Sequence, residues 1–171
     1  MAMQQDHPAT VPGLGRYAID TSGSAVTFRT RHLFGLAPVR GTFAIRAGTI
    51  DIAEPLTDSA IYAEIETASF RTRSGQRDRS VRSARFLDAG RHPLMTFRSD
   101  RIDHPAVTGT LTVRGVTRPV SMTVDQAEVS PRSFTARAST RIDRTEFGVT
   151  ASRGLAGRYL EVCLEVRCVR K

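Results

Sequence analysis

Apolar and polar residues alternate along most of the chain, and this alternation constrains the fold more than any other feature of the sequence. In the segment SAVTFRTRHLF, Val26, Phe28 and His32 fall on one side of an extended strand, whereas Thr27 and Arg29 fall on the other. Successive side chains of a strand point to opposite faces, so each such segment has one apolar and one polar face. The sequence therefore predicts a protein built mainly of half-buried β-strands.

About eight or nine segments of this kind follow one another, separated by turn residues such as Pro55 and Gly115. An antiparallel sheet of this size closes into a barrel or splits into a sandwich, because either arrangement protects its edge strands. Small inward residues such as Gly41, Ala63 and Gly109 favour closure. The predicted fold class is all-β, an antiparallel barrel of about eight strands, with either a ligand cavity or a solid core inside.

The length of 171 residues suits one domain, which we expect to span residues 15–171 after a disordered N-terminal arm of residues 1–14. No apolar run approaches the ~20 residues needed to cross a bilayer, which predicts no stable membrane insertion. The opening residues have no basic, apolar or cleavage-site features of a secretion signal. The expected location is therefore the cytoplasm.

The formal net charge of +8 raises the question of a nucleic-acid partner. Lys171 is the only lysine, and many of the arginines are interleaved with acidic residues. The chain has no tryptophan and only 3 tyrosines, so aromatic platforms for stacking bases are scarce. These features argue against nucleic-acid binding.

The residues that usually carry catalysis or bind metals show no recognisable arrangement. Cys163 and Cys168 lie on one predicted strand at an odd spacing, so they face opposite sides and cannot form an ordinary disulfide or share a metal ion. His32 is expected at the core or the rim, and Arg144 and Glu146 are expected to brace a loop. Motifs of hydrolases, metalloproteases and phosphate-binding loops are absent from the sequence. We predict no catalytic residues, no metal site, no cofactor and no enzyme activity.

An arginine-rich segment, RDRSVRSARFLDAGRHPLMTF, interrupts the run of strands. Residues 72–88 have helical spacing, and Asp78 lies four residues before Arg82, which supports a helical turn or anchors the insert to the barrel rim. With Val81 and Phe86 on an apolar inner side and arginines outside, the insert is predicted to plug one end of the barrel. A movable gate and a contact surface for an anionic partner are the other interpretations.

Four blocks of the chain carry a family resemblance. They are YAIDTSGSAVTFRTRHLFGLAPVRGTF, RDRSVRSARFLDAGRHPLMTFRS, VTGTLTVRGVTRPVSM and RIDRTEFGV. In this order they resemble the blocks of the YceI family, also called polyisoprenoid-binding proteins, along nearly the whole expected domain. The chain departs from the family at single positions: Tyr17 stands where tryptophan is usual, Gly23 and Ser80 where histidine is common, and Asp143 where asparagine is common.

The resemblance implies a lipocalin-like barrel with an apolar tunnel that binds and transports a long lipid, such as a polyisoprenoid, a quinone-like lipid or an acyl chain. The alternative function is a stress-response or interaction module with a solid core and no lipid ligand. A homodimer is a further possible assembly of the chain. Strand alternation assigns the barrel lining to Phe28, Phe43, Ile45, Ile61, Ile65, Phe97, Leu111, Val113, Met122 and Phe134. The expected rim or plug residues are His32, Asp78, Val81, Arg82 and Phe86.

Overall fold

The structure is a computed structural model that describes residues 11–32, 35–152 and 155–171. Residues 1–10 of the expected N-terminal arm lie outside the described residues. The strands are β1 (Gly15–Ile19), β2 (Ala25–His32), β3 (Ala37–Ile52), β4 (Ala60–Arg71), β5 (Leu94–Asp103), β6 (Ala106–Val113), β7 (Val116–Val129), β8 (Ser133–Asp143) and β9 (Tyr159–Arg170). The helices are α1 (Gly75–Arg82) and the 3-10 helices η1 (Thr21–Gly23), η2 (Leu56–Asp58) and η3 (Arg144–Phe147).

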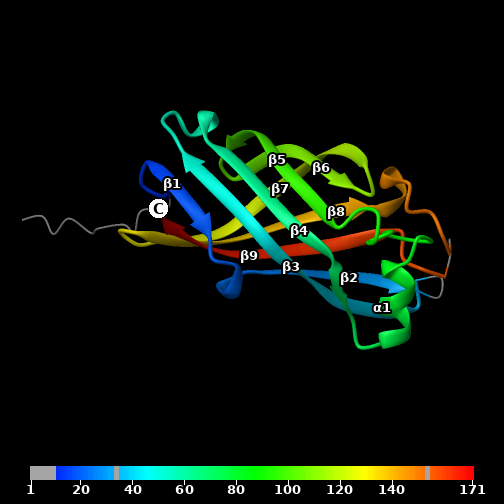
Figure 1. Cartoon of the computed structure of the whole chain (residues 1–171). Coiled ribbons are helices and arrows are strands. Elements are labelled where there is room, and N and C mark those ends of the chain that lie inside the picture. The colour runs from blue at the N-terminus through cyan, green and yellow to red at the C-terminus, as the bar shows by residue number, and fades with distance from the viewer. Residues whose placement is uncertain (1–10, 33–34, 153–154) are drawn as a thin grey trace, which may run out of the picture.

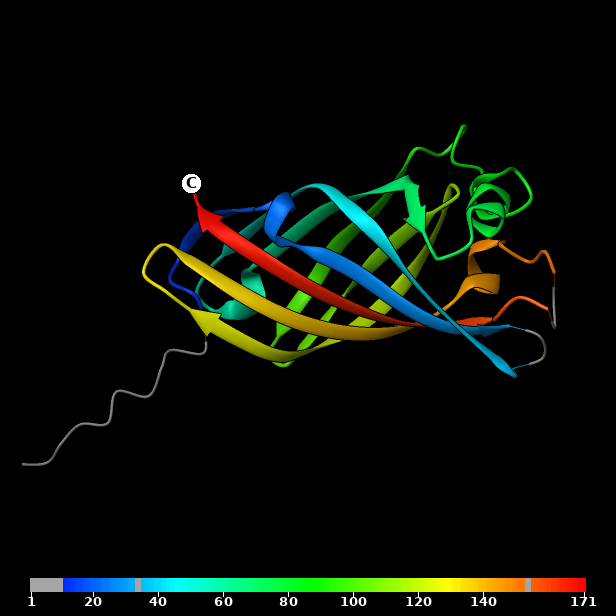
Figure 2. The same ribbon diagram turned by 90° about the horizontal axis from the view of Figure 1, so that it is seen from below.

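These strands belong to one antiparallel sheet that closes into a barrel. Neighbouring strands follow the order β3-β2-β9-β8-β7-β6-β5-β4, and β4 pairs again with β3. β1 pairs with β3 and β9 beyond the start of β2, so β1 and β2 share one position in the barrel. Figures 1 and 2 show the barrel from two directions, with α1 at one end and β1 near the other. The predicted antiparallel barrel of about eight strands is confirmed.

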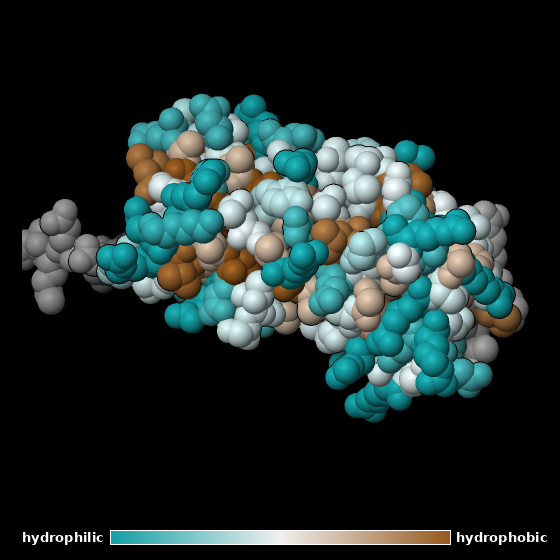
Figure 3. Space-filling view, viewed as in Figure 1, coloured by the Kyte–Doolittle hydropathy of each residue, from teal (hydrophilic) through white to brown (hydrophobic). Residues whose placement is uncertain are grey.

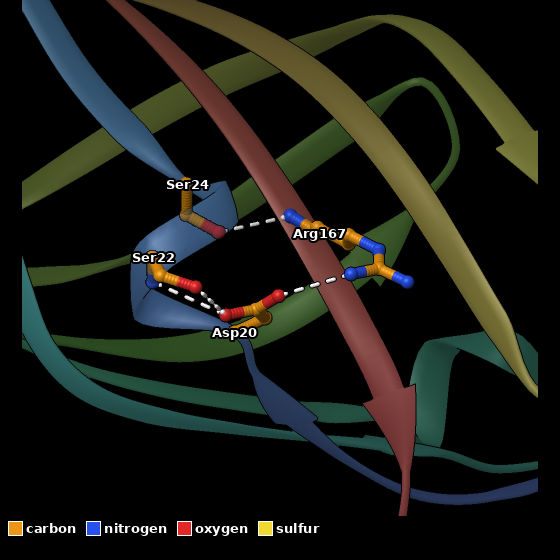
Figure 4. A network of polar contacts seen from close by, with 4 residues as sticks. All are labelled: Asp20, Ser22, Ser24 and Arg167. Atoms are coloured by element: carbon orange, nitrogen blue, oxygen red, sulfur yellow. Dashed lines mark hydrogen bonds and ion pairs between the residues drawn. The ribbon is translucent and has the colours of Figure 1, made fainter.

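A network of polar contacts stabilises the short segment between the end of β1 and the start of β2. The Asp20 carboxylate accepts hydrogen bonds from the backbone N–H and the hydroxyl of Ser22, at 3.1 and 2.7 Å, and so caps η1. Arg167 of β9 donates through its guanidinium to Asp20 at 3.1 Å and through its backbone N–H to the Ser24 hydroxyl at 2.9 Å (Figure 4). Both sides of the break are therefore tied to one residue of β9, which keeps β1 and β2 in the same strand position.

Cross-strand pairing brings the apolar faces of β2 and β3 together. Val26 lies opposite Phe43, and Phe28 lies opposite Gly41. A Cβ atom at Gly41 would lie 2.3 Å from the Cζ atom of Phe28, so the glycine leaves the space that this ring occupies. Val26 and Phe28 are buried, as their alternation with polar neighbours predicts.

Register shifts change which residues of a strand point inward. The pairing of β3 with β4 shifts between Ile45 and Ala47. Val39 and Ile45 are buried before the shift, whereas Ile50 and Ile52 are buried after it. Because a β-bulge adds one residue to a strand, it moves the inward set from odd to even positions. Comparable shifts occur in β5 and β7.

α1 covers one end of the barrel and is shorter than the helical segment of residues 72–88 predicted from the sequence. The Ser74 side chain accepts a hydrogen bond from the backbone N–H of Arg77 at 3.2 Å and caps the helix. Residues 84–87 form a turn instead of a continuation of the helix. Among the described residues, the helices are too short and too polar for any of them to cross a membrane.

Candidate functional site

An apolar cavity of about 550 Å³ occupies the barrel interior. Inward side chains of the strands form its walls, and residues of α1 and η3 contribute at one end. This volume lies within the range of about 300–1,000 Å³ that is typical of small-molecule sites, and it does not match a solid core. The residues that strand alternation assigned to the lining all face the cavity, namely Phe28, Phe43, Ile45, Ile61, Ile65, Phe97, Leu111, Val113, Met122 and Phe134.

Three phenylalanine rings form part of one wall. Phe28 stacks on Phe70 with 5.3 Å between ring centroids, and Phe43 approaches these two rings at 5.6 and 5.5 Å. Phe70 was missed in the sequence, because strict alternation from Ile65 places it on the outer face. The register shift near the end of β4 turns Phe70 inward.

The polar side chains of the lining gather at the end of the barrel covered by α1. They are Thr30, His32, Arg77, Ser80, Thr140, Arg144 and Ser152. His104, in the turn between β5 and β6, is a polar side chain at the opposite end. Within the described part of the chain, no aspartate or glutamate lines the cavity, so its charged lining residues are arginines. The cavity is therefore apolar along its length and polar, with positive charge, at one end.

Asp78 anchors α1 to the end of β4. Its carboxylate, buried in the structure, accepts hydrogen bonds from the backbone N–H and the hydroxyl of Thr72, at 2.9 and 2.7 Å. Arg82 donates to the carbonyl of Phe70 at 2.5 Å. The expected pairing of Asp78 with Arg82 within the helix is wrong, because Asp78 binds Thr72, just after β4, whereas Arg82 binds Phe70 in β4. These bonds match the other expectation, an anchor at the barrel rim.

The turn after α1 places apolar side chains over the same end of the barrel. Phe86 and Leu87 are buried, and Val81 of α1 packs against the same cluster. Arg114, in the turn between β6 and β7, donates to the carbonyl of Phe86 at 2.7 Å. The guanidinium of Arg85 donates to the Ser152 hydroxyl at 2.9 Å. The segment is thus held by β4, by the β6–β7 turn and by the loop before β9.

Arg144 braces the loop that faces α1, as expected from the sequence. Its guanidinium donates hydrogen bonds to the carbonyls of Val149, Ala156 and Gly157, at 2.8, 3.2 and 2.7 Å. The Asp143 carboxylate caps η3 by accepting a hydrogen bond from the backbone N–H of Thr145 at 3.0 Å. These contacts fix the loop between η3 and β9 at the polar end of the cavity.

The described residues show no metal site, and the buried thiol is unreactive. No group of three or more His, Cys, Asp or Glu side chains in the described ranges could hold a metal ion. Cys168 is fully buried, and burial raises the pKa of its thiol to about 12. A thiol with this pKa stays protonated at neutral pH, so Cys168 acts as a packing residue.

Arg77 and Ser80 are lining residues that the sequence reasoning missed. The insert was interpreted as basic outside and apolar inside, so its arginines were assigned to the outer face and Ser80 was not assigned to the lining. In the structure, Arg77, Ser80 and Val81 lie on the side of α1 that faces the cavity. Their spacing of three and four residues is the signal that could have found them, because such residues share one face of a helix.

Comparison with known proteins places this barrel among related sequences. The chain matches the model of the YceI-like domain over residues 17–168. A UPF0312 protein of Pectobacterium atrosepticum is 32% identical over 168 residues, which cover 91% of this chain and 86% of the relative. Protein YceI of Salmonella arizonae is 31% identical over 168 residues, which cover 91% of this chain and 87% of the relative.

Two solved structures share the fold. BcnA of Burkholderia cenocepacia superposes with a TM-score of 0.71 at 21% identity, covering 87% of this chain and 98% of BcnA. A polyisoprenoid-binding domain from Saccharophagus degradans gives a TM-score of 0.72 at 14% identity, covering 93% of this chain and 100% of that domain. At these identities the two structures support the fold alone. The match to the family model and the two sequence relatives lead to one conclusion: the chain belongs to the family of YceI-like domain proteins.

Proposed function

We propose that the protein binds and carries a long apolar lipid, an isoprenoid or an acyl chain, inside the barrel without catalysing a reaction. The observation that carries this proposal is the cavity of about 550 Å³ with its almost wholly apolar lining. Further support comes from the Saccharophagus degradans domain, which shares the fold and is described as polyisoprenoid-binding. The ten predicted lining residues are the proposed contacts of the lipid chain.

The volume of the cavity sets the size of the proposed ligand. A cavity of about 150 Å³ in another protein holds one benzene molecule, which corresponds to roughly 25 Å³ per non-hydrogen atom. On this scale, the cavity of about 550 Å³ accommodates about 20 non-hydrogen atoms. A chain of that length fits inside, and a longer polyisoprenoid extends beyond the barrel.

The distribution of polar groups sets the orientation of the proposed ligand. Thr30, His32 and Ser80 lie at the α1 end, together with the guanidinium groups of Arg77 and Arg144. A polar head group placed there finds hydrogen-bond donors, whereas the middle of the cavity offers apolar contacts. The ligand therefore lies with its head at the α1 end and its chain along the barrel axis.

Burial of the chain supplies the affinity. Each buried methylene contributes about 0.8 kcal/mol, so a dozen of them contribute roughly 10 kcal/mol before the cost of association. Affinity then rises with chain length, and the polar groups at the α1 end select the head group.

The proposal is tested with protein purified without detergent. Native mass spectrometry is expected to show one apolar molecule per chain, and organic extraction followed by mass spectrometry identifies it. Protein that is empty after purification is expected to take up one geranylgeraniol per chain. A chain that is empty and that binds neither an isoprenoid nor a fatty acid would contradict the proposed function.

A further inference from the structure

The positive charge of the protein is concentrated in one short stretch. Residues 71–91 hold seven of the 25 basic residues and two of the 17 acidic ones, so they carry five of the eight excess positive charges. The two acidic residues, Asp78 and Asp88, are only 6% and 9% exposed. The charge that this stretch presents to solvent is therefore positive.

Most of the arginines of this stretch lie on the surface. Arg71, Arg73, Arg79, Arg85 and Arg91 are all exposed. The ion pairs between described residues, such as those on the barrel wall, do not involve any arginine of residues 71–91. Figure 3 shows the hydrophilic side chains gathered over α1.

Apolar side chains are exposed beside this positive surface. Leu36, in the turn before β3, is 83% exposed, and Leu155, in the loop before β9, is 50% exposed. Figure 2 shows that the end of β2, the start of β3 and η3 lie at the same end of the barrel as α1. The hydrogen bond from Arg85 to Ser152 joins the arginine-rich segment to the loop that carries Leu155. Transfer of these exposed leucine side chains from water to an apolar environment would be favourable.

We infer that the α1 end is a docking surface for an anionic lipid membrane. Guanidinium groups of Arg73, Arg79 and Arg91 bind lipid phosphates, while Leu36 and Leu155 enter the boundary between head groups and acyl chains. Glu146 of η3 is exposed at this end and reduces the positive excess without cancelling it. This inference goes beyond the proposed function, because docking requires only the outer surface of the barrel.

A membrane fits this surface better than a nucleic acid does. Phosphate contacts alone would serve both partners, but exposed leucines contribute to insertion into lipid and not to contact with a phosphate backbone. The exposed aromatic ring of Tyr159 is covered by the guanidinium groups of Arg141 and Arg158, at 4.1 and 5.1 Å from its centroid. That ring is not available for stacking on bases.

Co-sedimentation with vesicles tests the inference. The vesicles are phosphatidylcholine with about one quarter phosphatidylglycerol, and phosphatidylcholine alone is the comparison. The test variant carries Arg73→Gln, Arg79→Gln and Arg91→Gln. Its side-chain changes remove no hydrogen bond or ion pair found among the described residues. The expected result is a loss of vesicle affinity on the order of 100-fold, with the fold retained by circular dichroism.

A matched variant removes the same charge elsewhere. Arg46, Arg98 and Arg132 are exposed on the barrel wall and at the opposite end, and their replacement by glutamine should leave vesicle affinity within about threefold. The double variant Leu36→Ser with Leu155→Ser should bind the vesicles more weakly, while the dependence of binding on salt remains.

Wild-type protein that does not bind the anionic vesicles at low salt would overturn the inference. Equal losses of vesicle affinity in the two arginine variants would also overturn it. So would a test variant that loses binding to duplex DNA while its vesicle affinity stays unchanged. Ligand occupancy, measured separately by native mass spectrometry, reports on the proposed function alone.

Discussion

Asp143 shows how one residue holds the loop at the polar end of the cavity. Its carboxylate accepts hydrogen bonds from the backbone N–H and the hydroxyl of Thr145, at 3.0 and 2.6 Å, and from the guanidinium of Arg158 at 3.0 Å. Burial acts to raise the pKa of Asp143, but these hydrogen bonds outweigh it and hold the pKa below its ordinary value. The folded state therefore favours the ionised carboxylate.

The stability from Asp143 should be lost in acid. Because its pKa is lower in the folded chain than in the unfolded chain, this stability is present above the ordinary value of about 4 and disappears as the pH falls through the folded value. Asp143→Asn should lower the free energy of unfolding by about 1–2 kcal/mol at pH 7 and flatten its decline between about pH 5 and pH 3. Urea unfolding across this range measures both effects, and a variant with an unchanged acid slope would contradict the assignment.

Ala63 offers a test of the cavity at the scale of one side chain. It faces the cavity from β4, opposite Phe97 in β5. Ala63→Phe should fill part of the empty volume, so lipid affinity should fall by about tenfold or more while the melting temperature changes little. Ala44→Phe, on the exposed side of β3, is the control and should leave affinity unchanged. Equal affinities of the two variants in a fluorescence titration would show that the lipid does not use this cavity.

At the scale of elements, α1 depends on buried hydrogen bonds more than on its own helical tendency. Its eight residues are too few for a stable isolated helix. Asp78→Ala removes the acceptor for the two groups of Thr72 and should cost about 1–3 kcal/mol. Backbone amides of residues 75–87 should then exchange faster with solvent, while those of β6 and β8 stay protected. The exposed neighbour Arg79→Ala should change neither quantity, and a uniform loss of protection would argue against a locally anchored helix.

The strands could be predicted from the sequence because alternation records which face is buried. The inward positions of β2 and the ten lining residues follow from that pattern alone. The register shifts could not be predicted, since a bulge such as the one near Ile45 leaves no local mark in the sequence. Phe70 was missed for this reason. The hydrogen-bond partners of Asp78 and Arg82 could not be predicted from alternation either. The fold brings these partners, at and just after the end of β4, next to α1.

At the scale of the whole molecule, the closed barrel separates two surfaces of different chemical character. The inner surface is apolar over most of its area and positive at one end, and the outer surface carries most of its excess charge at that same end. The sequence could indicate a barrel with a small-residue interior, but not whether its core was solid. The empty volume depends on how all the inward side chains fit together, and only the structure shows that.

The most direct test of a lipid-binding cavity is affinity as a function of chain length. A series of straight-chain alcohols of about 8 to 24 carbons can be titrated in competition with a fluorescent fatty acid. The cavity of about 550 Å³ predicts that affinity rises about fourfold with each added methylene until roughly 20 non-hydrogen atoms are buried, and then levels off. Affinity that does not depend on chain length, or the absence of binding across the series, would contradict the account.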